Sequence, residues 1–308
     1  MNKVQYIKNF GIKLFVIKSF RSLLLKKQSK FAWKINAINE KNIELYLMKI
    51  VKQKEDEIKK IKPEALHHGI LKDPIWIMWY QGIENAPDIV KCCIESVKEN
   101  CSGHEVIVLS EQNLSEFVKL PDFIIEKFKK GYISRTHLSD MIRLNLLYLY
   151  GGAWLDATLL TINPIPEEYF AKEIFTINFK KNTKDPSHGR WTTFCFFAKK
   201  GNRFIEKILR YHYGYWMKND YAVDYVMFDY FINYLIKNDH EFELLMDDIP
   251  VTNKNVFLLL EKLNMLCEDE KLLTDPNEVF YKLSWKRKFI IEDDDFTLHK
   301  SIMKKFYR

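Results

Sequence analysis

One stretch of this sequence, residues 133–161, constrains the fold more than any other. Across residues 138–149, apolar side chains recur at helical spacing with few polar interruptions, which predicts a nearly buried helix. Gly151 and Gly152 follow and end the helix, because glycine adopts the left-handed cap conformation without a side-chain clash. Residues 153–155 are apolar and predict a short strand. The stretch therefore predicts a helix, a glycine turn and a strand in succession.

Three charged side chains in this stretch are candidates for a binding site. The strand delivers Asp156 to its carboxyl end, which is where open α/β sheets place ligand chemistry. The other interpretation of Asp156 is an ordinary cap or turn residue. On the helix, Asp140 and Arg143 lie three residues apart and share one face. That face points to solvent, to each other or to a ligand, so a surface ion pair and a ligand site both remain open.

The elements around this stretch alternate between strand and helix. Residues 75–81 predict a strand, residues 88–101 a helix and residues 105–109 a second strand. This order predicts an α/β fold with a mostly parallel sheet flanked by helices. Later in the chain we expect strands at 173–180 and 192–199, a helix at 204–234, and a mobile polar loop near the site at 181–190.

Charge divides the chain into two parts. The 308 residues carry a net charge of +7, of which residues 1–62 contribute +11, which leaves −4 for the remainder. Residues 1–34 hold nine Lys/Arg and no acidic residue. The first 62 residues contain one glycine and no proline, and they predict helix. We therefore divide the chain into a basic helical N-terminal extension, residues 1–70, and a main domain, residues 71–308.

Three roles are open for the basic extension. It can pack on the main domain, touch an anionic membrane surface through residues 1–34, or bind nucleic acid. No nucleic-acid motif supports the last role, so we expect no nucleic-acid partner.

The chain has five cysteines without a C-x-x-C pair, which argues against a disulfide framework or a zinc site and for a reducing compartment. Without a signal peptide or an apolar run of spanning length, we expect a cytoplasmic location. We interpret Asp293–Asp295 as a solvated acidic turn rather than a metal site.

A motif in the organising stretch resembles a known family. The run S-D-x-x-R-x-x-x-L-Y-x-Y-G-G-x-W-x-D-x-T, from Ser139 to Thr158, is similar to the signature of glycosyltransferases with a DxD-type nucleotide-sugar site. It resembles most the capsular polysaccharide synthesis branch of the family that includes yeast α-mannosyltransferases (glycosyltransferase family 32-like). The usual motif ends in a second aspartate, where this chain has Thr158. The resemblance covers residues 72–290 and implies the GT-A fold, with a mostly parallel Rossmann-like sheet flanked by helices.

The resemblance also implies donor-binding residues outside the motif. In the family, the end of the first strand contacts the nucleoside, which points to Tyr80 and Gln81 here. The segment K-L-S-W-K resembles a late element of the branch, and related enzymes use their C-terminal segment as a lid over the diphosphate. Lys282 and Lys286 are therefore candidates for phosphate contacts. Asp229 begins a D-Y-F element of the branch and is a catalytic candidate, although a helix aspartate can equally be a surface residue.

Aromatic residues near the motif have two interpretations each. Trp154 is either a core residue or a ring that stacks on the donor base. We interpret Trp76 and Trp79 as buried core aromatics.

The chemistry implied by the resemblance assigns roles to the motif. A nucleotide sugar leaves as a nucleoside diphosphate with developing negative charge, which Mn²⁺ or Mg²⁺ neutralises as a Lewis acid. Asp156 is the expected catalytic carboxylate and metal ligand, and Thr158 offers a weaker hydroxyl ligand. Asp140 is expected to bind sugar or ribose hydroxyls. Arg143 anchors Asp140 or neutralises phosphate.

The resemblance implies an enzyme. We expect transfer of a hexose from a nucleotide sugar, a UDP-sugar by preference, to a growing, lipid-linked bacterial capsular or surface polysaccharide. Retention at the anomeric carbon and peripheral attachment to the inner face of the plasma membrane are part of this expectation. The alternative from another class is a non-catalytic nucleotide-sugar or glycan-binding subunit of a polysaccharide assembly. Asp140 and Asp156 argue against that alternative, whereas Thr158 leaves it open.

Overall fold

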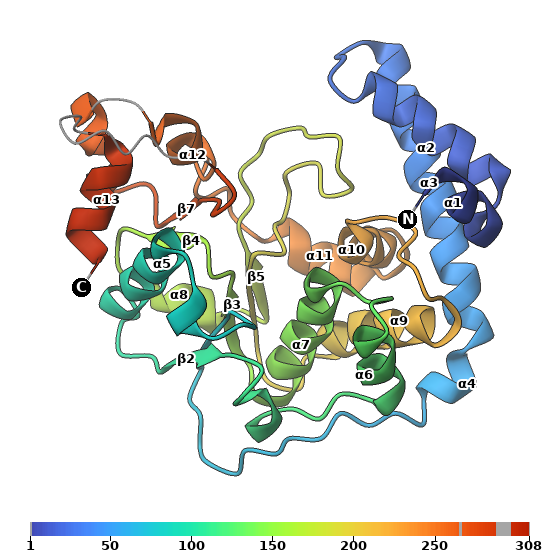
Figure 1. Ribbon diagram of the computed structural model, residues 1–308, viewed down its shortest axis with the longest axis horizontal. Coiled ribbons are helices and arrows are strands. Elements are labelled where there is room, and N and C mark those ends of the chain that lie inside the picture. Colours follow the sequence, from blue (N-terminus) through green and yellow to red (C-terminus); the bar gives the residue numbers. More distant parts are fainter. Residues whose placement is uncertain (1, 265–266, 288–296, 308) are drawn as a thin grey trace.

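A five-stranded sheet lies at the centre of the computed structural model, which describes residues 2–264, 267–287 and 297–307 (Figure 1). Its order is β2-β1-β3-β6-β5. The strands are β1 (Ile75–Met78), β2 (Val106–Leu109), β3 (Gly152–Leu155), β5 (Ile174–Thr176) and β6 (Cys195–Ala198). β1 pairs in parallel with β2 and β3, whereas β6 is antiparallel to β3 and to β5. Four strands thus run one way and β6 alone is reversed, so the α/β class with a mostly parallel sheet is confirmed. The acidic run Asp293–Asp295 lies outside the described residues.

Helices cover both sides of this sheet, with α5 and α8 on one side and α7 and α9 on the other (Figure 1). The bounds are α5 (Asp88–Glu99), α6 (Asp122–Lys129), α7 (Arg135–Tyr150), α8 (Glu167–Ala171), α9 (Arg203–Lys218), α10 (Met227–Asn238), α11 (His240–Asp247), α12 (Leu258–Lys262) and α13 (Leu298–Phe306). Within the described residues, the 3₁₀ helices are η1 (Ile83–Asn85), η2 (Leu114–Glu116) and η3 (Cys267–Thr274). The single helix expected at 204–234 is therefore two helices, and the connection between them brings Tyr225 to the surface.

Helix α7 and strand β3 form as the sequence predicts. The side chain of Ser134 caps α7 by accepting a hydrogen bond from the backbone N–H of His137. The helix stops at Gly151, whose φ is +75°. Gly152 opens β3 with a φ of +86°, and it lies so close to Pro74 that a β-carbon would come within 2.0 Å of that residue's carbonyl oxygen. The glycine pair therefore serves both the turn and the close pairing of β3 with β1.

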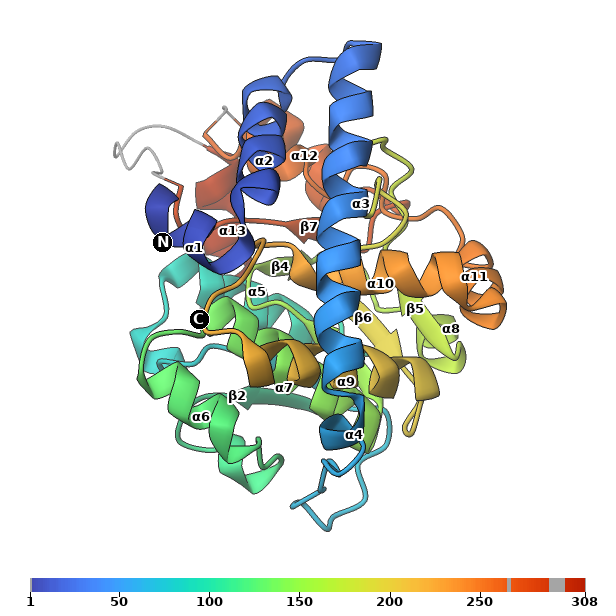
Figure 2. The same ribbon diagram turned by 90° about the vertical axis from the view of Figure 1, so that its right-hand side faces the viewer.

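Four helices make up the basic N-terminal segment: α1 (Lys3–Phe10), α2 (Ile12–Leu24), α3 (Lys30–Gln53) and α4 (Glu55–Ile58). Figure 2 shows the long α3 lying across the outer side of α9 and α10. Tyr6 is buried, and its hydroxyl donates to the backbone oxygen of Val223 at 3.1 Å. Lys18 forms a 2.8 Å ion pair with Asp224. The segment thus packs on the main domain, as one of its three interpretations predicts. No helix in the described ranges is long and apolar enough to cross a bilayer.

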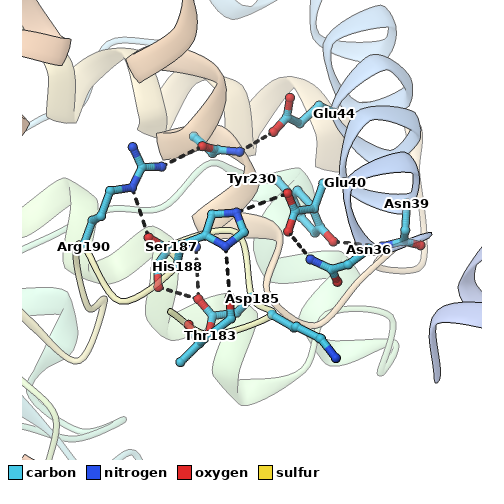
Figure 3. A network of polar contacts seen from close by, with 12 residues as sticks. Asn36, Asn39, Glu40, Glu44, Thr183, Asp185, Ser187, His188, Arg190 and Tyr230 are labelled. Carbon is cyan, nitrogen blue, oxygen red and sulfur yellow. Dashed lines mark hydrogen bonds and ion pairs between the residues drawn. The ribbon is translucent and has the colours of Figure 1, made fainter. Parts of the chain in front are cut away.

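The loop at 181–190 is held by the N-terminal helices instead of being free (Figure 3). His188 lies between Glu40 of α3, with Nε2 3.4 Å from Oε2, and the carbonyl oxygen of Thr183, 2.9 Å from Nδ1. The buried ammonium of Lys184 donates to backbone carbonyls at the end of α2, among them that of Leu25 at 3.1 Å. These contacts join segments about 150 residues apart, which local sequence patterns do not reveal.

A second, two-stranded sheet brings the C-terminal part of the chain to the end of β3. Strand β4 (Leu159–Thr161) is antiparallel to β7 (Phe280–Lys282), with Leu159 opposite Lys282. The next residue, Leu283, donates its backbone N–H to the carbonyl oxygen of Thr158 at 2.8 Å. This pairing fixes Lys282 beside the residues that follow β3.

Candidate active site

A cavity of about 520 Å³ opens where β1 and β3 end. Four parts of the chain line it together with Tyr225: the end of β1 with the residues that follow it (78–81), one side of α7 (residues 135–143), residues 154 and 156–158 at the end of β3, and residues 282–286 at β7. The β1 strand is shorter than predicted, because residues 79–81 leave the sheet and turn along the cavity. Carboxyl ends of neighbouring parallel strands are the usual ligand position of such sheets.

Most of the predicted site residues converge on this cavity. Those that line it are Tyr80, Gln81, Arg143, Trp154, Asp156, Thr158, Lys282 and Lys286. Asp140 and Asp229 do not line it. The eight residues that line the cavity come from four separate parts of the chain, so their convergence is a property of the fold and not of any one motif.

Asp156 lies at the centre of a hydrogen-bonded cluster. Its Oδ1 accepts from Trp154 Nε1 at 3.0 Å and from Arg143 Nη2 at 3.3 Å, while its Oδ2 accepts from Lys282 Nζ at 2.8 Å. Burial opposes ionisation of this carboxyl, but the charges of Lys282 and Arg143 outweigh it and hold the pKa below its usual range. Asp156 is therefore ionised at neutral pH and paired with two cations.

Arg143 is fixed from several sides. One guanidinium nitrogen donates to the backbone oxygen of Thr193, and the group lies 5.0 Å over the ring of Trp154. Its Nη2 lies 3.7 Å from Asp140 Oδ1. Only 5% of the Arg143 side chain and 8% of the Asp140 side chain are exposed, so the surface-pair interpretation is wrong. Asp140 contacts Arg143 rather than the cavity, which makes it a support for the arginine.

Asp229 does not line the cavity either. Its carboxylate accepts from Trp191 Nε1 at 2.8 Å. Burial, reinforced by the charge of Asp185, raises its pKa to about 7. In the folded protein this carboxyl is therefore half protonated near neutral pH.

This shift predicts a pH effect on stability. Because the folded protein holds the Asp229 proton up to about pH 7 and the unfolded chain releases it near 3.8, stability from this residue falls as pH rises between these values and is constant above them. Asp229→Asn removes the effect. We expect the free energy of unfolding of wild type, relative to the variant, to decrease from pH 4 to pH 7 in urea titrations. Asp88→Asn, at an exposed position of α5, is the control. Parallel pH profiles for wild type and Asp229→Asn would show that the carboxyl titrates normally.

Two tryptophans that line the cavity, Trp79 and Trp285, are not among the predicted site residues. Trp79 does not lie in the core as predicted: it is half-buried and lines the cavity, because β1 ends at Met78. Its ring meets that of Trp285 edge to face at 5.8 Å. Trp76 is fully buried as predicted and donates its Nε1 to the carbonyl oxygen of Gly151 at 3.0 Å. Trp285 lies in the sequence between Lys282 and Lys286, the two predicted phosphate-binding lysines, and this position is a sequence signal that it belongs to the site. No sequence pattern indicates that Tyr225 lines the cavity.

The two predicted metal ligands, Asp156 and Thr158, both accept a hydrogen bond from the side chain of Lys282. Lys282 Nζ lies 2.8 Å from Asp156 Oδ2 and 2.8 Å from Thr158 Oγ1. A divalent cation on these two oxygens meets the ammonium of Lys282, so the donor set does not fit a metal with the lysine in this position. The part of the chain that the structure describes holds no group of three or more histidine, cysteine, aspartate or glutamate side chains able to bind one.

Comparisons with known proteins found a matching family, sequence relatives and a solved structure with limited similarity. The model of a family described as "Capsular polysaccharide synthesis protein" matches residues 25–305. Glycosyltransferase afumC of Aspergillus fumigatus is 35% identical over 95 residues, 28% of this chain and 24% of that protein. O-glycosyltransferase braB of Annulohypoxylon truncatum is 26% identical over 169 residues, 48% of this chain and 39% of that protein. The chain thus spans between about a quarter and two fifths of the length of these relatives. A solved "PaToxG Glycosyltransferase" structure has a TM-score of 0.36 and 15% identity, covering 69% of this chain and 90% of its own.

Proposed function

The chain belongs to the capsular polysaccharide synthesis protein family, and from that premise we propose that it is a glycosyltransferase that moves a hexose from a nucleotide sugar to a hydroxyl group of a glycan. The matched relatives are named glycosyltransferases, which supports the reaction class. The observation that carries the proposal is the cluster of Asp156, Arg143 and Lys282 in a cavity at the strand ends.

The charge of the cavity suits a nucleoside diphosphate. Its lining residues include four cationic side chains and one carboxylate, an excess of three positive charges; they are Arg135, Arg143, Lys282, Lys286 and Asp156. A nucleotide sugar brings two phosphate charges, and a departing diphosphate develops a further one. Cationic groups fixed in a partly buried site stabilise that developing charge more than they do in water. We assign the phosphates to the side of the cavity between Arg143 and Lys282.

The aromatic side of the cavity suits a base. Trp79 and Trp285 lie beside Tyr80 and Gln81, and the ring of Trp285 is 44% exposed. Stacking of a base on an aromatic side chain contributes about 1–3 kcal/mol and tolerates different bases. We place the nucleoside there, with Gln81 as a hydrogen-bonding partner.

The finer features of the proposal are a GT-A fold, a UDP-hexose donor, retention at the anomeric carbon and a lipid-linked saccharide acceptor. Four parallel-directed strands with β6 reversed, and the β4–β7 pair beside them, support the fold assignment. The fungal relatives are glycosyltransferases too, and one is named an O-glycosyltransferase, so the acceptor is the part that needs a direct experiment.

Nucleotide binding tests the proposal. We expect one of UDP, GDP and dTDP, together with its hexose derivatives, to raise the melting temperature of the protein. Arg143→Lys keeps the charge but loses the forked guanidinium that joins Asp156 to the Thr193 carbonyl oxygen. In titrations it should lower the affinity of the protein for that nucleotide about tenfold or more. Arg203→Lys, at an exposed ion pair with Glu241, is the matched control. No shift with any of the three nucleotides would contradict the donor assignment.

A membrane surface is the proposed partner of the N-terminal helices. Lys3 and Lys8 of α1 and Lys13 of α2 are exposed, and α2 also presents an apolar stripe at helical spacing made of Ile12, Val16, Phe20 and Leu23. Leu23 is 78% exposed. Apolar side chains flanked by lysines match an anionic bilayer, to which each basic residue contributes about 1 kcal/mol. Such a position brings the enzyme to a lipid-linked acceptor.

Vesicle binding checks this partner. We expect the protein to co-sediment with vesicles containing phosphatidylglycerol, less at high salt, and not with neutral phosphatidylcholine vesicles. Serine at Ile12, Phe20 and Leu23 together should remove the binding, because it takes away the apolar stripe and leaves the buried face of α2 intact. Leu244→Ser, at an exposed position of α11, should not. Equal sedimentation of both variants and wild type would contradict the assignment.

A further inference from the structure

The ammonium of Lys282 occupies the space between the two oxygens that the motif assigns to a metal. It hydrogen-bonds Asp156 Oδ2 and Thr158 Oγ1, both at 2.8 Å, and lies 5.0 Å over the ring of Phe194. These are the distances of charge-assisted hydrogen bonds from an ammonium group. Divalent Mg²⁺ bound to the same oxygens lies about 2.1 Å from each, and an ammonium at this place repels it.

The backbone fixes this lysine in its position. Lys282 lies in β7 opposite Leu159, the residue directly after Thr158. Its backbone N–H donates to the carbonyl oxygen of Val256 at 2.7 Å, and Leu283 donates to that of Thr158 at 2.8 Å. Only 18% of the Lys282 side chain is exposed. The lysine therefore lies in the small sheet whose other strand, β4, begins directly after Thr158, and moving its Cα away breaks strand pairing.

The charges of Lys282 and of the two motif side chains that it contacts balance without a metal. A D-x-D motif offers two carboxylates, whose total charge a divalent cation neutralises. In this chain the second position is Thr158, so the motif carries one negative charge, and Lys282 supplies one positive charge at the same place. The threonine still accepts a hydrogen bond there but adds no charge. Thr158 in place of the second aspartate lowers the negative charge of the motif by one, and the single positive charge of Lys282 matches the charge that remains.

We propose that Lys282 replaces the divalent cation of the site, so that the protein binds and activates its donor without a metal ion. The inference rests on the proposed sugar transfer. In that reaction the bond between the anomeric carbon and the phosphate oxygen breaks, and its electron pair stays on the departing diphosphate. The oxygen of the acceptor hydroxyl forms the new bond to the anomeric carbon, and its proton is released to water. Lys282 turns its hydrogen bonds toward the phosphate oxygen, with Arg143 as the second cation.

Binding of Mn²⁺ tests the replacement without any need for activity. We expect no Mn²⁺ site that depends on Asp156 when wild type is titrated and free Mn²⁺ is followed by electron paramagnetic resonance. Lys282→Met frees both oxygens and should create a site for one ion, which Asp156→Asn in the same chain removes. A Mn²⁺ site in wild type that is lost in Asp156→Asn would overturn the proposal.

Nucleotide affinity supplies the second readout. With EDTA or with MnCl₂, the affinity of wild type for its best nucleotide among UDP, GDP and dTDP should agree within about twofold. In EDTA, Lys282→Met should lose about tenfold or more and Lys282→Arg should retain most of the affinity, because a hydrogen bond to a charged group contributes about 1.5–3 kcal/mol. Lys129→Ala, at an exposed position in the last turn of α6, is the control, and melting curves confirm that each variant is folded. Wild-type binding that EDTA abolishes and Mn²⁺ restores would overturn the proposal. If no nucleotide binds under either condition, the donor assignment fails instead, and the Mn²⁺ titration still decides the role of Lys282.

Discussion

Replacing Asp156 by asparagine is expected to lower sugar transfer by about three orders of magnitude, since losing one preorganised hydrogen-bond donor in a catalytic site costs about 10²–10³-fold and Asp156 holds two cationic donors in place. Asparagine keeps the size of the side chain and can still accept the hydrogen bond from Trp154. It cannot hold Arg143 and Lys282 together, because it has no charge. The two cations then repel each other and leave the positions that the diphosphate requires.

The measurement for Asp156→Asn is the initial rate of nucleoside diphosphate release, with the melting temperature recorded on the same preparation. Asp88→Asn, an exposed aspartate 3.7 Å from Lys91, shows what the loss of an ordinary surface carboxylate does. A rate for Asp156→Asn within about threefold of wild type would remove Asp156 from the centre of the account.

Replacing Gly152 by alanine is expected to destabilise the protein by about 3 kcal/mol or more, from a left-handed φ and a backbone clash together. The φ of Gly152 is +86°, and an added β-carbon would lie 2.0 Å from the carbonyl oxygen and 2.7 Å from the nitrogen of Pro74. Pro74 cannot withdraw, because its carbonyl oxygen accepts the backbone N–H of Ala153 at 2.8 Å where β3 meets β1. The strand that carries Asp156 must therefore shift.

A second glycine separates the two causes. Gly103 has nearly the same φ, +85°, and no atom within 4 Å of an added β-carbon. Gly103→Ala should cost only the conformational part, about 1–2 kcal/mol. Chemical unfolding of both variants measures the difference. Equal losses would mean that the contact between β3 and Pro74 relaxes freely, and that the glycine pair is only a turn.

Single helices, strands and turns can be predicted from this sequence, because interactions between residues near one another in the chain determine them. The helix α7 and its stop at Gly151 depend on periodicity and on glycine, both visible in one stretch. The reversed direction of β6 depends on which strands it meets, and no local pattern encodes that. The break between α9 and α10 was missed because apolar residues continue through the turn that carries Tyr225.

The candidate site divides in the same way. Asp156 follows from its place after a predicted strand, and the resemblance supplied Tyr80 and Lys282, which the fold brings to the same cavity. Lys282 was expected at phosphate; its bonds to Asp156 and Thr158 join residues more than 120 positions apart and are visible only in the structure. Trp79 lines the cavity instead of lying in the core, because β1 ends at Met78, one residue before it.

The most direct test of the central claim is hydrolysis of nucleotide sugars by the purified protein without an added acceptor. A panel of UDP-, GDP- and dTDP-hexoses is incubated with wild type and with Asp156→Asn, and nucleoside diphosphate and free hexose are quantified. We predict that wild type cleaves at least one donor slowly and releases the two products in equal amounts, while Asp156→Asn stays at the uncatalysed rate. If a nucleotide sugar binds to wild type but its cleavage never exceeds that of Asp156→Asn, the protein is a nucleotide-sugar-binding subunit and not a transferase.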